Sequence, residues 1–294
     1  NYNEQTFTAY QHNPENPHSL ITNDVTDISP STQHDDGLWI STYYRGIEYL
    51  DITSGQFTHY NKNTVPGLPC EQTWTVLDGG DGNLYIGHVG SGFSILSLKD
   101  KSVKNFRNEA GNPMSLPGND VFCIIKDTNG NIWLGTNKGL ALYNAANENF
   151  ITFKKNKNDK YDTLCSRILS IRQLKDNKLW IASELNGIAI LNLKQSMFLS
   201  PEEISLEYIQ EGADNRSLSN ASARCIFQDS FDNIWIGTWG GGINFISSKP
   251  PLFTTLSYSP IPNNENSLNN KVASSLCMDR QGRVWIGTDG GGIN

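Results

Sequence analysis

Residues 234–238 read Ile-Trp-Ile-Gly-Thr, and five other segments of the chain repeat this phrase with small changes. The copies are LWIST at 38–42, LYIGH at 84–88, IWLGT at 132–136, LWIAS at 179–183 and VWIGT at 284–288. They recur about every fifty residues, and a period of this length indicates a repeat architecture.

The residues around the IWLGT copy predict four short strands. Residues 121–125 are apolar and rich in β-formers, and Asp-Thr-Asn-Gly at 127–130 reads as a turn because Asn-Gly tolerates positive φ. The phrase lies in a second strand at 131–135, and two further apolar segments follow at 140–143 and 150–153. No segment has a 3.6-residue apolar period long enough for a helix.

The same register holds in all six copies. The residue two places after the aromatic residue is always small, and so is the residue ten places before it. The second set consists of Ser29, Thr75, Cys123, Ser170, Cys225 and Ser275. We interpret this position as a tightly packed site, at which Cys replaces Ser as a buried free thiol.

A four-stranded antiparallel unit repeated six times predicts a β-propeller, because stacking the sheets around an axis buries both apolar faces of each one. We expect one all-β domain over residues 1–294, with blades at about 21–60, 69–106, 117–153, 165–208, 219–258, and 269–294 together with 5–10. The segment from Phe7 to Tyr10 would close the ring as a fourth strand beside the three C-terminal strands. The alternative is that the chain is an excised part of a seven-bladed ring.

Composition excludes several classes of protein. The net charge of −7 argues against a nucleic-acid partner. No apolar stretch is long enough to span a bilayer. The five cysteines form no CxxC motif, and the five histidines show no metal-binding spacing. We therefore expect free thiols, no metal and no cofactor.

The repeat resembles a known family in its full pattern. Asp-x-x-Gly-x-hydrophobic-Trp-hydrophobic-Gly-Thr, followed by Gly-Gly-hydrophobic-Asn, is similar to the two-component regulator propeller repeat. Residues 279–294 match it throughout, and residues 127–139 and 229–244 match closely. The linker Asn-Pro-x-x-Pro-x-Ser-Leu at 13–20 is also typical of that family.

The resemblance implies a periplasmic sensor region of a Bacteroides-type hybrid two-component histidine kinase. It implies neighbouring propeller and immunoglobulin-like domains in the parent chain, and it is compatible with a homodimer. It also implies detection of oligosaccharides from polysaccharide breakdown. The chain departs from the family pattern in two ways. It has six repeats rather than seven or fourteen, and its first two repeats are degenerate.

Residues that recur in every repeat are expected to be structural. The Gly-rich runs at 240–242 and 290–292 precede strands rather than helices, so they predict tight hairpins instead of phosphate sites. Asp127, Asp229 and Asp279 each stand six residues before the repeat Trp, which predicts turn capping. The repeat aromatic residues are expected in the core, and we expect no catalytic residue.

The turn between the second and third strands breaks the repeat pattern. Its aromatic residues Tyr43, Tyr44 and Trp239 stand where other repeats carry polar residues or Gly. In a propeller these turns share one face with the interblade loops, so their side chains are expected to gather around one rim. The candidate ligand-binding residues are Tyr43, Tyr44, Arg45, His88, Lys138, Glu184, Asn186, Trp239 and Asp289.

Aromatic rings combined with hydrogen-bond donors and acceptors suit a sugar ligand, because sugars offer C–H patches and hydroxyls. A merely solvated rim is the alternative interpretation. The sequence thus favours a non-enzymatic, extracytoplasmic sensor that binds an oligosaccharide and signals to a histidine kinase. A propeller lyase or glycosidase and a protein–protein interaction scaffold are the two alternatives.

Overall fold

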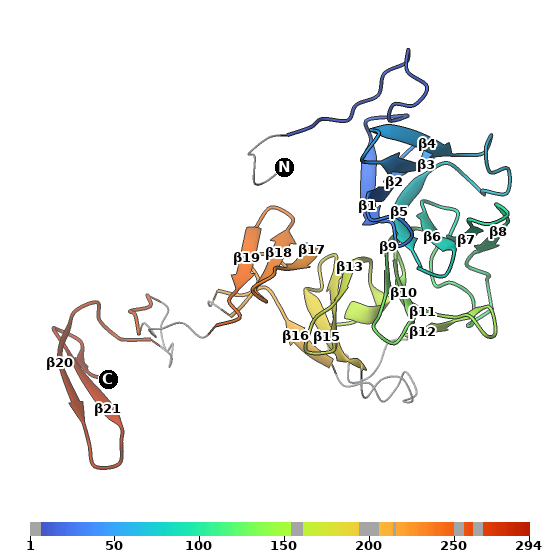
Figure 1. The fold of residues 1–294 in the computed structure, drawn as a ribbon. Helices are drawn as coiled ribbons and strands as arrows, with labels where there is room; N and C mark the ends of the chain where they lie inside the picture. The colour runs from blue at the N-terminus through green and yellow to red at the C-terminus, as the bar shows by residue number, and fades with distance from the viewer. Residues whose placement is uncertain (1–6, 154–160, 194–205, 214–215, 250–255, 261–266) are drawn as a thin grey trace. The chain divides into compact units, whose positions relative to one another are not determined.

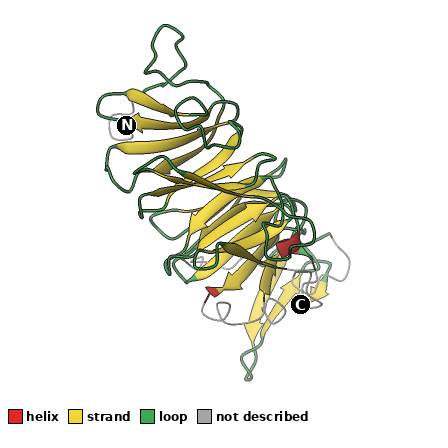
Figure 2. Cartoon of the chain, turned by 90° about the vertical axis from the view of Figure 1, so that its right-hand side faces the viewer, coloured by secondary structure: helices red, strands yellow, loops and turns green. Residues whose placement is uncertain are grey.

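The computed structural model describes residues 7–153, 161–193, 206–213, 216–249, 256–260 and 267–294. These residues form β-strands joined by turns, with a short 3-10 helix, η1 (Thr163–Cys165) (Figure 2). Among them, no helix has the length and apolar character that crossing a bilayer requires. The chain divides into two compact units, residues 1–246 (unit 1) and 247–294 (unit 2).

Unit 1 contains five antiparallel sheets, which we number in chain order (Figure 1). Sheet 1 consists of β1 (Val25–Pro30), β2 (Gly37–Thr42), β3 (Gly46–Asp51) and β4 (Gln56–Tyr60). Sheet 2 consists of β5 (Thr73–Asp78), β6 (Asn83–His88), β7 (Phe93–Ser97) and β8 (Val103–Phe106). Sheet 3 consists of β9 (Val121–Lys126), β10 (Ile132–Thr136), β11 (Gly139–Asn144) and β12 (Asn149–Thr152).

Sheet 4 consists of β13 (Ile168–Gln173), β14 (Lys178–Ser183), β15 (Ile188–Asn192) and β16 (Leu206–Ile209). Sheet 5 has three described strands, β17 (Ala223–Gln228), β18 (Ile234–Thr238) and β19 (Gly242–Ile246). The segment in which a fourth strand of sheet 5 was expected lies partly outside the described residues.

Consecutive sheets of unit 1 pack face to face, as expected for propeller blades. The first strands β1, β5, β9, β13 and β17 each contact the next. Four apolar cores fill the spaces between neighbouring sheets, and each contains the Leu that opens a repeat: Leu68, Leu116, Leu164 and Leu218. The all-β propeller fold predicted from the sequence is confirmed.

The repeated aspartates cap turns, as predicted, and they also hold the repeat tryptophans. Asp127 Oδ1 accepts hydrogen bonds from the backbone of Asn129 and Asn131, at 2.9 Å each, and Asp127 Oδ2 accepts one from Trp133 Nε1 at 2.9 Å. The same indole bond joins Asp229 to Trp235 at 3.0 Å. A local sequence pattern therefore fixes both the hairpin and the orientation of its aromatic side chain.

Repeats that lack this aspartate use other solutions. Trp39 Nε1 donates a hydrogen bond to Asp78 of sheet 2 at 3.2 Å. Six residues before Trp39, where other repeats have the aspartate, this repeat has Gln33. In sheet 4 the aspartate position is Leu174, and buried Trp180 Nε1 has no hydrogen-bond partner within the described structure. Degenerate repeats thus keep the strand but lose the standard indole bond.

The tightly packed site of the repeat is a contact between the first and second strands. Gly135 pairs with Cys123, and a Cβ on Gly135 would lie 2.5 Å from the Cys123 sulfur. In sheet 1 the prediction of Ser29 at this site is wrong, because the longer first hairpin shifts the register and Asp27 pairs with Ser41. Burial raises the pKa of Asp27, which accepts a hydrogen bond from Thr75 Oγ1 at 2.6 Å.

The prediction that every repeat aromatic residue is buried is wrong at two positions. Trp39, Tyr85, Trp133 and Trp180 are at most 7% exposed, whereas Trp235 is 40% and Trp285 is 43% exposed. The buried four face a neighbouring sheet of unit 1, whereas Trp235 belongs to the last sheet of unit 1 and Trp285 to unit 2. The five thiols are free, but Cys225 is exposed rather than buried for the same reason.

The predicted closing strand is not found. Residues 7–10 form no strand, and Phe7 is fully exposed. Instead the Tyr10 ring packs against Phe57 at 5.8 Å, and Leu20 joins the small core on the outer face of sheet 1. The N-terminal segment therefore covers sheet 1, and the closure of a ring stays a prediction.

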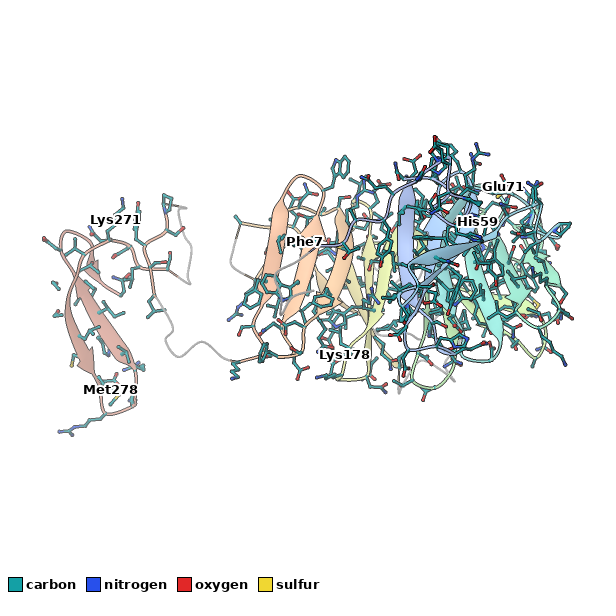
Figure 3. All side chains as sticks on the ribbon, turned by 45° about the horizontal axis from the view of Figure 1, so that its top comes forward. Phe7, His59, Glu71, Lys178, Lys271 and Met278 are labelled. Atoms are coloured by element: carbon teal, nitrogen blue, oxygen red, sulfur yellow. The ribbon has the colours of Figure 1, made fainter. Side chains whose placement is uncertain are left out.

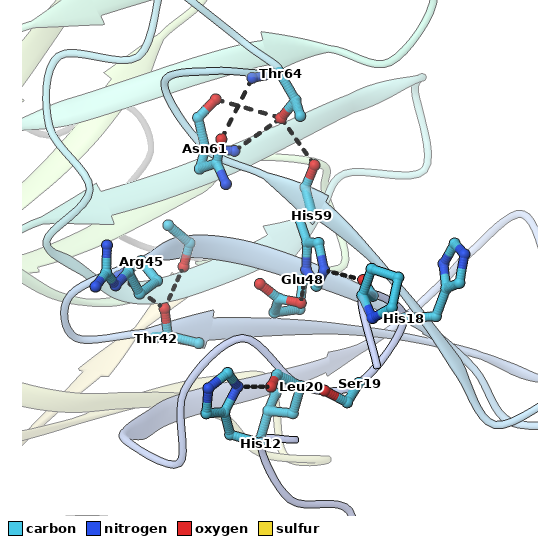
Figure 4. Close-up of polar contacts among 12 residues, drawn as sticks. His12, His18, Ser19, Leu20, Thr42, Arg45, Glu48, His59, Asn61 and Thr64 are labelled. Carbon is cyan, nitrogen blue, oxygen red and sulfur yellow. Dashed lines mark hydrogen bonds and ion pairs between the residues drawn. The ribbon is translucent and has the colours of Figure 1, made fainter. Parts of the chain in front are cut away.

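Two histidines hold this covering segment (Figure 4). His12 Nδ1 contacts the carbonyl oxygen of Leu20 at 2.8 Å. His59 contacts buried Glu48 at 2.6 Å through Nδ1 and the carbonyl oxygen of Pro17 at 2.8 Å through Nε2. Burial raises the pKa of Glu48 to about 7, against the opposing effect of the bond to His59.

Unit 2 contains sheet 6, with β20 (Ala273–Met278), β21 (Val284–Thr288) and β22 (Gly292–Ile293). Its hairpin repeats the Asp–Trp bond, from Trp285 to Asp279 at 3.0 Å. Apolar side chains of this sheet, including Met278, are exposed (Figure 3).

Candidate functional site

One repeated backbone hydrogen bond joins each turn between the second and third strands to the residue immediately before the first strand. Tyr43 N donates to Asp24 O at 2.9 Å, and Trp239 N donates to Ser222 O at 2.9 Å. The equivalent donors in the other repeats are Val89, Asn137, Glu184 and Asp289. These six residues therefore occupy equivalent positions in their turns.

A β-bulge lies beside this bond in every first strand. The register of each first strand shifts by one residue next to the turn, which leaves one residue outside the ladder. The bulged residues are Thr26, Trp74, Phe122, Leu169, Arg224 and Ser274. Bulges commonly re-aim a side chain near a functional site, and here they bring it beside the rim turns.

The first half of the site is a row of aromatic rings that crosses sheets 1 to 3. Tyr44 and Tyr43 have ring centroids 4.5 Å apart, Tyr43 and Trp74 are 6.0 Å apart, and Trp74 and Phe122 are 5.6 Å apart. All three contacts are edge-to-face, which is a favourable geometry for aromatic pairs. Tyr44 is 53% exposed, so the row begins at the surface.

The second half continues through charged groups across sheets 4 and 5. The Arg167 guanidinium lies 4.4 Å from the centre of the Phe122 ring and pairs with Glu184 at 3.3 Å. Arg224 contacts the other oxygen of Glu184 at 3.8 Å and lies 4.3 Å from the centre of the Trp239 ring. Trp239 is 67% exposed.

We call this set the aromatic–arginine row. Its members are Tyr44, Tyr43, Trp74, Phe122, Arg167, Glu184, Arg224 and Trp239. Of the predicted candidates, the structure brings Tyr43, Tyr44, Glu184 and Trp239 into the row.

Other predicted candidates lie near the rim without contacting the row. Arg45 and Lys138 are exposed in their turns. The Asn186 carbonyl oxygen accepts a hydrogen bond from Gln210 Nε2 at 3.0 Å, which fits a structural role. Asp289 belongs to unit 2.

The expectation that His88 lies on an open rim is wrong. His88 is fully buried, with Nδ1 3.4 Å from the Cys70 sulfur and Nε2 2.8 Å from Ser94 Oγ. Burial lowers the pKa of His88 to about 4. A neutral imidazole cannot stabilise a thiolate as an ion pair, so this cluster does not have the electrostatics of a cysteine nucleophile.

Four members of the row were missed as candidates from the sequence: Trp74, Phe122, Arg167 and Arg224. Three of them occupy the bulge, directly before the small residue of the packed site. Across the repeats this position varies between large, aliphatic, charged and small residues while its neighbour stays small. That contrast is the signal that could have identified them.

Three segments of the chain match the model of the two component regulator propeller, at residues 115–138, 217–240 and 267–290. Each segment contains the opening Leu, the capping Asp and the phrase with its Trp. These three segments are two component regulator propeller repeats.

A solved structure supports the same assignment over the whole length. The extracellular domain of a hybrid two component system from B. thetaiotaomicron is 62% identical, with a TM-score of 0.74, and the match covers 100% of this chain and 36% of that one. Histidine kinase P4 of Formosa agariphila is 33% identical over 94 residues, which are 30% of this chain and 7% of that protein. The chain thus spans about a third of the structure and a small part of the kinase.

More distant structures share the fold alone. The extracellular domain of a second B. thetaiotaomicron two component system is 20% identical with a TM-score of 0.60, and the match covers 94% of this chain and 33% of that one. From the 62% identity with an extracellular domain, we place this propeller chain outside the cytoplasm, as part of a periplasmic ectodomain.

Proposed function

We propose that this chain is the ligand-sensing part of a hybrid two-component system and that its aromatic–arginine row binds an oligosaccharide. Binding would be passed to a histidine kinase elsewhere in the parent protein. The observation that carries the proposal is the row itself, in which ring and guanidinium contacts link five sheets without a break.

The chemistry of the row supports a saccharide ligand. Sugar rings present flat C–H faces that pack on aromatic rings, and the exposed rings of Tyr44 and Trp239 offer such surfaces. Sugar hydroxyls need donors and acceptors, which Glu184 and the two arginines supply. A row that crosses several sheets suits an extended chain of sugars better than a compact metabolite.

The position of the row supports a role in signalling. Every rim turn is hydrogen-bonded to the residue immediately before the first strand of its own sheet, and in unit 1 consecutive first strands contact one another. A ligand that spans several sheets therefore binds one arrangement of those sheets better than another. Differential affinity of this kind is what shifts a signalling equilibrium.

An enzymatic function has less support. Glycoside hydrolysis commonly needs a pair of carboxylates that flank the scissile bond, and Glu184 is the one carboxylate of the row. The His88 cluster does not suit nucleophilic catalysis, for the electrostatic reason given above.

Binding of saccharide digests to the chain tests the proposal, with two matched variants of sheet 5. Trp239→Ala removes an exposed ring at the row, and Phe231→Ala removes a 75% exposed ring at the hairpin between β17 and β18. We expect Trp239→Ala and Trp74→Ala to weaken binding at least about ten-fold, as loss of a ring platform does. Phe231→Ala should bind like the wild type.

The outcomes separate the candidate functions. Saturable binding without new products supports a sensor, and appearance of shorter saccharides would indicate a lyase or glycosidase. Equal affinities for the Trp239→Ala and Phe231→Ala variants would remove the row from the site. In the parent protein, a bound saccharide should change autophosphorylation of the kinase, and Trp74→Ala should abolish that change.

A further inference from the structure

Two guanidinium groups share one carboxylate in the aromatic–arginine row. Arg167 Nη1 lies 3.3 Å from Glu184 Oε2, and Arg224 Nη2 lies 3.8 Å from Glu184 Oε1. The second distance is too long for a strong hydrogen bond. One carboxylate therefore pairs well with one arginine and only loosely with the other.

The two arginines are held in place by aromatic rings. Arg167 stacks on Phe122, which is 6% exposed, and Arg224 stacks on Trp239. Stacking occupies the face of a guanidinium and leaves its N–H edge available for hydrogen bonds. The side chains of Arg167 and Arg224 remain 44% and 37% exposed, so a ligand can reach them.

The donors of the pair are not all used within the described part of the chain. Arg224 Nε is buried and has no hydrogen-bond partner there. Two positive charges against one negative charge also leave a local excess, in a chain whose net charge is −7.

The geometry points to an acidic saccharide as the ligand of the aromatic–arginine row, with a carboxylate or sulfate group of one sugar bound by Arg167 and Arg224. This inference rests on the proposed function and names the class of its ligand. Oxyanions match the planar N–H fork of arginine, which can bind them through two parallel hydrogen bonds. The exposed Tyr44 ring, at the other end of the aromatic half, then carries a neighbouring sugar ring.

Three tetrasaccharides built on galactose-type units test the inference by calorimetric titration of the chain. A galacturonan carries carboxylates, a carrageenan carries sulfates without carboxylates, and a galactan is neutral. We expect one charged probe to bind at least about ten-fold more tightly than the neutral one, which corresponds to one charge-assisted contact. Its affinity should fall as salt is raised, because exposed charges are screened.

Four variants separate recognition of charge from the rest of the site. Arg167→Gln and Arg224→Gln should reduce affinity for the charged probe to about that of the neutral one and abolish the salt dependence. Glu184→Gln should strengthen binding of the charged probe, since it removes the competing carboxylate. Arg283→Gln is the control, because Arg283 also pairs with an aspartate and stacks on a Trp outside the row.

Each result decides one claim. If the neutral galactan binds as tightly as the charged probes, or if the arginine variants bind all probes normally while Trp74→Ala does not, the acidic ligand is wrong and the proposed function stands. If no charged probe binds while neutral digests do, the same conclusion follows. If nothing binds although the melting temperature shows a folded chain, both proposals fail.

Discussion

The third and fifth repeats have nearly the same sequence and nearly the same local structure, but very different burial. IWLGT in β10 and IWIGT in β18 each end a hairpin whose Asp binds the indole of Trp, at 2.9 and 3.0 Å. Sheet 3 has apolar cores on both faces, whereas sheet 5 is the last sheet of unit 1 and, within that unit, packs through one face. Trp133 is consequently 1% exposed and Trp235 40%.

This comparison separates what a repeat does alone from what its neighbours add. The hairpin, the capping bond and the bulge are complete within one repeat, because their partners are a few residues apart. Burial needs the next sheet. The same phrase therefore fixes the strand in both repeats, and the neighbouring sheet determines how much the aromatic side chain stabilises.

The largest expected effect is at the two tryptophans. Trp133→Ala should lower the free energy of unfolding by about 3–5 kcal/mol, the range for removing a buried aromatic side chain. Trp235→Ala should cost less, because that residue is 40% exposed and loses less buried apolar area. Urea denaturation followed by circular dichroism measures both, and equal losses would show that burial does not distinguish the two repeats.

A methyl group at the packed site should give the next largest effect. A Cβ on Gly135 would lie 2.5 Å from the Cys123 sulfur and 2.7 Å from the Ile168 side chain of sheet 4. Gly135→Ala should therefore cost about 1–3 kcal/mol, as overpacking usually does. At Gly237 the close neighbour is the sulfur of exposed Cys225, at 2.7 Å. Gly237→Ala should lower the urea midpoint less, and the reverse order would contradict the comparison.

The covered outer face of sheet 1 gives a pH-dependent test. The folded pKa of Glu48 is raised from 4.5 to about 7 by burial. Its stabilising effect is therefore fully present below about pH 4.5 and is lost as the pH rises through about 7. Glu48→Gln keeps the neutral form, so the melting temperature of this variant should fall less between pH 5 and pH 8 than that of the wild type.

Glu15→Gln, on the same N-terminal segment, is the control for this experiment, since Glu15 is exposed. It should reproduce the pH profile of the wild type. A Glu48→Gln profile parallel to that of the wild type would mean that Glu48 is already ionised in the folded protein.

The smallest expected effect concerns the hydrogen bond between Asp229 and Trp235 in sheet 5. Hydrogen bonds from Trp235 and Asn233 lower the pKa of Asp229 to about 2. The stabilisation is present above about pH 3.8 and is lost as the pH falls through about 2. Asp229→Asn should thus lower the melting temperature slightly at pH 5 and by a smaller amount at pH 2, where Asp229 is partly protonated. Asp24→Asn serves as an exposed control, and a deficit that is undiminished at pH 2 would contradict the ionic role.

The comparison also explains which features could be predicted from the sequence. Three features follow from local patterns and are found in the structure: the strands, the small residue two places after the repeat aromatic residue, and the role of Asp127 in its turn. The placement of Ser29 failed because an insertion in the first hairpin moved the register to Asp27. The exposure of Trp235 could not be read from its repeat, because it depends on the next sheet.

The candidate site was predictable only in part for a similar reason. Tyr43 and Trp239 stand out because they break the repeat pattern in a turn. Trp74, Phe122 and Arg224 lie in a strand, where large side chains look like ordinary core residues. Their displacement from the ladder is a property of pairing between strands, and a single repeat does not reveal it. Whether the row binds a ligand stays a prediction.

The bulge in each first strand gives this architecture a way to evolve. A residue outside the ladder is not fixed by strand pairing, and among the repeats this position holds threonine, tryptophan and arginine in the same kind of sheet. Six such positions, one per repeat, can diversify independently while the scaffold is conserved. Descendants of one ancestral propeller could acquire new surface chemistry on this rim by point substitution at these positions, with little loss of stability along the way.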